Sequence, residues 1–190
     1  MAESVRPRLE IFVDGTNFRI AQLDAGIRDL NVPRLARQLA SGYVLVKMRY
    51  YTSPLPDNQP RAYAGQHRFF ERLRETRAID LVLGRHEPRR ESFTCPSCGA
   101  AIIHRHHVEK ETDVNLATDM VVGAYTNRYD VAMLVAGDTD YVPAIQAVQA
   151  TGRKVIWCHF STQANRDRLR QVCDEQILLD EKFLRPCIQR

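Results

Sequence analysis

The sequence has no apolar run long enough to cross a membrane, and residues 1–8 lack the apolar core of a secretory signal peptide. It also lacks the even set of closely spaced cysteines that marks a disulfide framework, because only Cys95 and Cys98 of its five cysteines lie close together. These absences argue against an integral membrane protein and against a disulfide-rich secreted protein. We therefore expect a cytoplasmic protein with no membrane partner.

Internal repeats and low-complexity segments are also absent, and the excess of positive charge is small. The 190 residues carry a formal net charge of +4, a balance that permits a nucleic-acid partner without requiring one. Hydrophobic residues make up 44% of the chain, which is enough to build a core. We expect one domain over residues 1–190, and the sequence leaves its oligomeric state open.

Strand and helix patterns alternate along most of the chain. This alternation predicts an α/β fold with a mostly parallel central sheet and helices on both of its faces. The expected strands are residues 9–13, 43–51, 79–83, 131–136 and 155–159, with a further short apolar run at 176–179. The expected helices begin after Asn31, cover residues 59–77, 112–127 and 141–150, and resume from about residue 164.

Residues 85–108 interrupt this alternation. The segment is polar and basic, and it contains the sequence Cys95-Pro96-Ser97-Cys98-Gly99. We interpret it as a small β-hairpin insertion whose tip carries the cysteine pair.

Aspartates follow two of the apolar runs directly. Asp14 ends the first predicted strand, and Asp138 and Asp140 follow the fourth, while Asp113 stands at the start of a predicted helix. Helix capping is the competing explanation for each of them taken singly. Because ligand sites lie outside the carboxyl ends of parallel strands, we expect these carboxylates to converge. Converging carboxylates repel unless a cation neutralises them, and all-oxygen ligands suit Mg²⁺ or Mn²⁺.

Two other protein classes that carry a functional motif directly after the first strand do not fit this sequence. A haloacid-dehalogenase-type phosphatase would need a nucleophilic aspartate two residues before Asp14, where this chain has Phe12. A dinucleotide-binding domain would need a glycine-rich Gly-x-Gly-x-x-Gly turn, and none follows the first strand.

Three segments in this order resemble the NYN domain family, and more narrowly its LabA-like branch, which is related to PIN-domain nucleases. They are Asp14-Gly15-Thr16-Asn17, residues 109–120 and residues 129–143, within a likeness that covers about residues 8 to 180. The resemblance implies a PIN-like three-layer α/β/α sandwich and a Mg²⁺- or Mn²⁺-dependent ribonuclease. A non-catalytic RNA-binding or regulatory module on the same fold is the alternative.

The resemblance also assigns roles to individual residues. By motif match, Asp14, Asp113 and Asp138 would form the metal-binding core. Asn17, Asp119 and Asp140 would support that core. A single-stranded RNA substrate would need basic contacts outside it, and we expect these from Arg85, Arg89, Arg90, Arg105 and Lys110 around the insertion.

The insertion also holds residues that could bind a structural zinc ion. Cys95 and Cys98 have the spacing of one zinc knuckle, and His104 and His106 could complete a Cys₂His₂ site. Free thiols are the competing interpretation. A redox pair is disfavoured, because the two cysteines do not open a helix after a strand.

Overall fold

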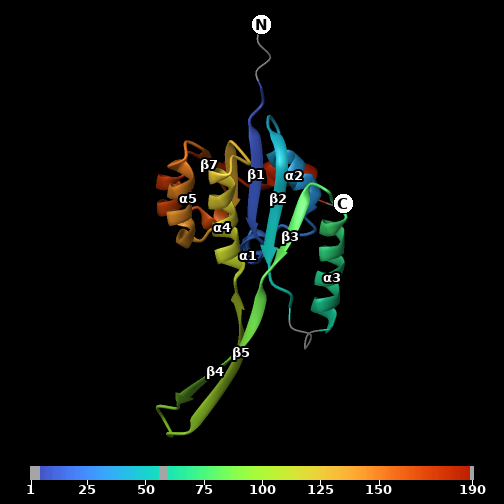
Figure 1. Cartoon of the computed structure of the whole chain (residues 1–190). Helices are drawn as coiled ribbons and strands as arrows, with labels where there is room; N and C mark the ends of the chain where they lie inside the picture. The colour runs from blue at the N-terminus through green and yellow to red at the C-terminus, as the bar shows by residue number, and fades with distance from the viewer. Residues whose placement is uncertain (1–4, 56–59, 189–190) are drawn as a thin grey trace.

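In a computed structural model, which describes residues 5–55 and 60–188, a parallel sheet flanked by helices carries a long hairpin at one end (Figure 1). Six strands among the described residues pair in the order β3-β2-β1-β6-β7-β8, each parallel to its neighbour. They are β1 Arg8–Asp14, β2 Val44–Thr52, β3 Ile79–Leu83, β6 Val131–Val135, β7 Lys154–His159 and β8 Glu175–Leu178. All five expected strands are therefore present in one sheet, and the short apolar run at 176–179 largely coincides with its sixth strand, β8.

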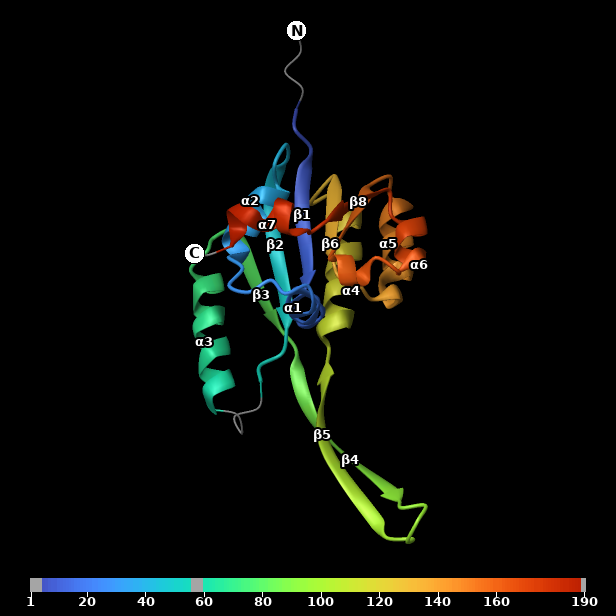
Figure 2. The ribbon, with the colours of Figure 1, turned by 180° about the vertical axis from the view of Figure 1, so that it is seen from behind.

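Helices cover both faces of the sheet and complete the three-layer α/β/α sandwich (Figures 1 and 2). One face is covered by α1 Gly15–Asp24, α2 Val32–Leu39, α3 Pro60–Arg74 and α7 Glu181–Leu184, and the other by α4 Thr112–Tyr125, α5 Val142–Gln149 and α6 Asp167–Val172. Three short 3₁₀ turns, η1 Thr139–Tyr141, η2 Ser161–Gln163 and η3 Arg185–Cys187, link these elements. The part of the expected helix at Gln59 lies outside the described residues. No helix among the residues described is long and apolar enough to span a bilayer.

Strand β1 lies at the centre of the sheet and is buried on both faces. Its alternate side chains Leu9, Ile11 and Val13 enter the core beneath α1 and α2, while Phe12 enters the core beneath α4 and α5. This two-sided burial explains why the strand appears in the sequence as a nearly continuous apolar run.

Glu10 is the exception in this buried strand, because it places a carboxylate rather than an apolar side chain in a fully buried position. Two arginines neutralise it, with Arg49 Nε 2.7 Å from Oε1 and Arg128 Nε 3.2 Å from Oε2. Arg128 also donates to the carbonyl of Asp119 in α4 at 2.9 Å. The buried ion group therefore ties β1 and β2 to the helix that covers them.

The predicted insertion is a hairpin, and it forms a separate two-stranded sheet that projects from the body as an arm (Figure 1). Strands β4 Arg85–Thr94 and β5 Ala101–Lys110 pair antiparallel, from Arg85 opposite Lys110 to Thr94 opposite Ala101. We call residues 85–110 the arm. The cysteine pair lies in its tip, where Gly99 adopts a left-handed φ of 71°. Each strand of the arm has ten residues, and the two strands form a sheet separate from that of the body. The insertion is therefore longer than the small hairpin that the sequence predicted.

We expect Glu10→Ala to lower the free energy of unfolding by roughly 2–3 kcal/mol. The change leaves two arginines without their buried partner, and the loss is kept below that of a wholly buried pair because both arginines reach solvent. Fluorescence of Trp157, the chain's single tryptophan, can follow unfolding in denaturant. Glu175→Ala, which removes an exposed carboxylate 3.5 Å from Lys154, is the control and should cost less than about 1 kcal/mol. Equal losses in the two variants would contradict a structural role for the buried group.

Candidate active site

The carboxyl ends of β1 and β6 bring Asp14 and Asp138 to the same edge of the sheet. The two strands are neighbours, with Val13 opposite Val135. Both aspartates also cap the element that follows, because Asp14 Oδ1 accepts from the Asn17 N–H and Asp138 Oδ1 accepts from the Asp140 N–H, each at 2.9 Å. Capping and convergence are therefore compatible, since capping occupies only one oxygen of each carboxylate.

A buried tyrosine joins the second oxygen of Asp14 to Asp113. The Tyr141 hydroxyl lies 3.2 Å from Asp14 Oδ2 and 3.0 Å from Asp113 Oδ1. One hydroxyl has one proton, so it cannot donate to both carboxylates at once. The two acids are thus held close together with their negative charge only partly compensated.

Burial and the neighbouring acids both disfavour the charged forms of Asp14 and Asp113. Burial raises the pKa of Asp14 to about 6, and the charges of Asp113 and Glu109 add to this against the hydrogen bonds from Asn17 and Tyr141. The pKa of the more exposed Asp113 is raised as well, first by desolvation and then by the charges of Asp138, Glu109 and Asp140. We call Asp14, Glu109, Asp113, Asp138 and Asp140 the acidic cluster.

Glu109 belongs to this cluster although the sequence interpretation gave it no role. Its carboxylate accepts from Thr16 at 2.9 Å and from Thr112 at 2.7 Å. It therefore links the last residues of β5 to α1 and α4, and it fixes the base of the arm beside the acids. Gly84 allows the same close approach, since a Cβ there would lie 2.5 Å from the Lys110 carbonyl oxygen and from Thr112 Oγ1.

Asn17 braces the site and does not take part in the contacts among the acids. Its side-chain oxygen accepts from the Gly137 N–H at 2.9 Å and from Gln163 Nε2 at 2.6 Å. Both partners are donors, so the amide orientation is fixed and the oxygen is fully used. Only the amide nitrogen of Asn17 remains to contact a ligand.

Asp119 is not brought to the cluster. Its carboxylate accepts from the Tyr51 hydroxyl at 2.9 Å and lies 3.8 Å from Arg49 Nη1, within the ion group around Glu10. It shares α4 with Asp113, but six residues of helix separate them by about 9 Å along the axis. The family motif assigns Asp119 a supporting role at the metal site, but its carboxylate instead contacts Tyr51 and Arg49.

The three predicted metal ligands are not close enough together to form a closed set of direct ligands. Within the described part of the chain, Asp14, Asp113 and Asp138 do not all come within 4.8 Å of one another. Mg²⁺ usually keeps several waters and binds through one or two carboxylates. The cluster can therefore accept such an ion without collapsing onto it.

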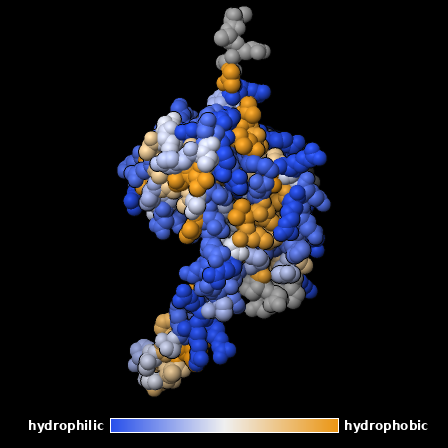
Figure 3. All heavy atoms as spheres, in the orientation of Figure 1, coloured by the Kyte–Doolittle hydropathy of each residue, from blue (hydrophilic) through white to orange (hydrophobic). Residues whose placement is uncertain are grey.

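The predicted RNA-binding residues fall into two groups. Arg85 is held in ion pairs with Glu87 and Glu111 at the base of the arm. Arg89, Arg90 and Arg105 are exposed along the strands, and Lys110 is half-buried at the base. The strands of the arm are largely hydrophilic, and exposed Phe93, Ile102 and Ile103 gather near the tip (Figure 3).

A groove of about 630 Å³ opens between α1, α3 and the base of the arm, and its lining includes Thr16, Arg19, Phe69, Arg72, His86 and Glu109. His86 lies directly opposite Glu109, and Arg90 lies directly opposite Arg105 further along the arm. Because residues an even number of positions apart share one face of a strand, both pairs lie on the same face of the arm. Arginines therefore line the groove and occur again on the same face of the arm.

The parallel sheet with helices on both faces and acids at the carboxyl ends of its central strands is consistent with a PIN-like α/β fold. The NYN domain matches residues 8–180, and the chain therefore belongs to the NYN domain family, part of the PIN-like nuclease superfamily. The narrower assignment to the LabA-like branch stays a prediction. NYN nucleases generally depend on divalent metal ions and act on nucleic acids.

The fold is also similar to a crystal structure of a protein of unknown function from Vibrio parahaemolyticus. The two share 18% sequence identity, with a TM-score of 0.67 over 97% of this chain and 99% of the other. At that identity the likeness supports the fold alone. No relative was found among curated proteins.

We expect Asp14→Asn to stabilise the protein above pH 6 in buffer with a chelator, and to do so far less at pH 4. The folded-state pKa of Asp14 is raised to about 6 from an ordinary value of 3.8. The folded state then holds this proton more tightly than the unfolded chain, so wild-type stability falls as pH rises from about 4 to about 6. Asparagine keeps the cap and removes this cost, which is of the order of 2–3 kcal/mol.

Thermal unfolding across that pH range measures the effect. Asp130→Asn is a control of opposite sign, because hydrogen bonds from Arg8 lower the pKa of Asp130 and its loss should destabilise the protein at neutral pH. A constant difference between wild type and Asp14→Asn at every pH would contradict the raised pKa of Asp14, which burial causes first and the neighbouring acids increase.

Proposed function

We propose that this protein is a divalent-metal-dependent ribonuclease that hydrolyses phosphodiester bonds of single-stranded RNA at the acidic cluster. The observation that carries the proposal is the pair of carboxylates, Asp14 and Asp113, held on one tyrosine hydroxyl at 3.2 and 3.0 Å. Such an arrangement concentrates negative charge in a partly buried place, which is costly unless a cation binds there.

The donor set fits Mg²⁺ or Mn²⁺, since every candidate ligand is a carboxylate oxygen. Asp14, Asp113 and Asp138 would hold the ion, with Asp140 and Glu109 beside them. A bound divalent ion supplies neutralisation of phosphate charge and a more acidic water. The residues of the chain supply the geometry, because Tyr141 holds two of the acids and Asn17 locks the loop at Gly137 that presents the third.

The groove and the arm support a single-stranded substrate. Arg19 and Arg72 in the groove can pair with phosphates, and Phe69 offers an aromatic ring to an unstacked base. Arg90 and Arg105 continue this path along the arm. Asp119 in this proposal positions α4 through Tyr51 and Arg49, and it does not contact the substrate.

We expect Asp14→Asn and Asp113→Asn each to reduce cleavage of a labelled single-stranded RNA by about 100-fold or more with Mg²⁺ or Mn²⁺ present. Loss of one ligand removes several kcal/mol of charge stabilisation at the phosphate. Asp119→Asn is the matched control and should keep cleavage close to that of the wild type, because its carboxylate lies outside the cluster.

Gel analysis of the products, together with RNA binding measured in parallel, separates the possible outcomes. Binding without cleavage by the wild type would favour a non-catalytic RNA-binding module. A loss in Asp119→Asn equal to that in Asp14→Asn would return Asp119 to the site.

The double variant Arg90→Gln/Arg105→Gln should weaken RNA binding and flatten its salt dependence. Each lost phosphate contact lowers the slope of log K against log salt by about 0.7 for a single strand, or about 1.4 for the pair. Fluorescence anisotropy at several salt concentrations measures this slope. Arg34→Gln/Arg37→Gln removes the same charge from α2, at the opposite end of the sheet from the arm (Figures 1 and 2), and should leave the slope unchanged. Equal effects of the two double variants would show that only net charge matters.

A further inference from the structure

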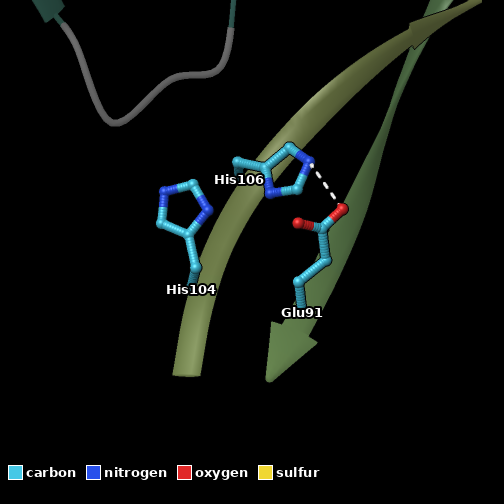
Figure 4. A group of neighbouring side chains, drawn as sticks. All are labelled: Glu91, His104 and His106. Atoms are coloured by element: carbon cyan, nitrogen blue, oxygen red, sulfur yellow. Dashed lines mark ion pairs between the residues drawn. The ribbon is translucent and has the colours of Figure 1, made fainter. Parts of the chain in front are cut away.

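A second group of metal-ligand side chains lies on the arm, apart from the acidic cluster. One ligand atom from each of Glu91, His104 and His106 lies within 4.8 Å of the other two (Figure 4). Among the described residues, no other group of three or more histidines, cysteines and acids places its ligand atoms this close together. It contains neither cysteine of the expected Cys₂His₂ site.

The register of the hairpin produces this convergence. His104 and His106 are two residues apart on β5 and share one face, and Glu91 on β4 lies directly opposite His104. The two imidazole rings stack with centroids 5.0 Å apart, and His106 Nε2 lies 3.8 Å from Glu91 Oε1. The other ring nitrogen of His106, Nδ1, is buried and has no hydrogen-bond partner.

We propose that Glu91, His104 and His106 bind one divalent transition-metal ion, of the class of Zn²⁺ or Co²⁺. Imidazole nitrogens suit such ions, and two histidines with one glutamate are a ligand set that zinc accepts. Metal–ligand bonds of about 2.0–2.2 Å place ligand atoms roughly 3.4 Å apart, so small side-chain rotations close the site from its present spacing. Mg²⁺ is disfavoured here because it prefers oxygen ligands.

A metal ion at this site would cross-link the two strands of the arm, which are otherwise joined by their backbone pairing. A lone two-stranded hairpin is marginally stable in water, and an ion bound from both strands joins them between the base and the tip. Three protein ligands also leave one coordination position open to water or to an anionic oxygen. Arg89, opposite His106, is exposed, so its charge is largely solvated and opposes the ion only weakly.

The cysteines lie too far along the arm to share this ion. The pairing of Glu91 with His104 is three residues from the last pair, Thr94 with Ala101, and the cysteines follow beyond that pair. Three residues of strand span about 10 Å. The expected Cys₂His₂ site would therefore require the hairpin to unpair, whereas the Glu91 site uses the register as it stands.

Titration of the chelator-treated full-length protein with Co²⁺ tests the proposal. Excess Mg²⁺ in the buffer occupies oxygen-ligand sites, and the wild type should bind about one Co²⁺ per chain without the thiolate charge-transfer absorption that cysteine ligands give. His104→Ala and Glu91→Gln should each weaken binding by more than the roughly 10- to 100-fold that loss of an outer-shell partner costs. Thermal unfolding of each variant checks that the body of the fold is kept.

Two matched controls decide the ligands. His107→Ala removes an imidazole on the opposite face of β5, where its ring lies 6.3 Å from that of His86, and it should bind Co²⁺ as the wild type does. Cys95→Ser/Cys98→Ser should also bind normally. Loss of binding in the cysteine variant, alone or together with His104→Ala, would overturn the proposal, and so would a wild type that binds no Co²⁺. None of these readouts involves RNA, so their outcome is independent of the proposed ribonuclease activity.

Discussion

Repulsion among carboxylates at one edge of a parallel sheet is the constraint on which the rest of this structure depends. Strands β1 and β6 deliver Asp14 and Asp138 to that edge, and helix α4 delivers Asp113. The fold relieves the repulsion only in part, because the Asn17 N–H caps one oxygen of Asp14 and a single tyrosine hydroxyl is shared between Asp14 and Asp113. Under the proposed function, the stability that this repulsion costs is offset when the cluster binds a cation.

The surroundings hold this unfavourable arrangement in place. On one side Asn17 ties the end of β1 to the loop after β6, and on the other Glu109 ties the arm to α1 and α4. Beneath them, Glu10 is neutralised by two arginines and anchors the central strand. The buried Glu10 is paired with two arginines, whereas Asp14 forms no ion pair among the described residues.

Local sequence signals predicted the sheet, because strands buried on both faces appear as apolar runs, and the same runs predicted Asp14 and Asp138 at their ends. Helix α1 has no apolar stripe and went unassigned beyond its cap. The bridging role of Tyr141 and the place of Glu109 in the site were not predicted, because both come from contacts between elements. The expected zinc ligands differ from the observed group because cross-strand register, and not sequence spacing, sets the distances along the arm.

Calorimetric titration with Mg²⁺ tests the central claim most directly, since this ion suits the acidic cluster and not the imidazoles of the arm. The wild type should bind Mg²⁺ at neutral pH, Asp14→Asn should bind it at least about tenfold more weakly, a loss of about 1.4 kcal/mol, and Asp119→Asn should bind it as the wild type does. Binding of Mg²⁺ by Asp14→Asn with wild-type affinity would contradict the assignment of the acidic cluster as the metal site.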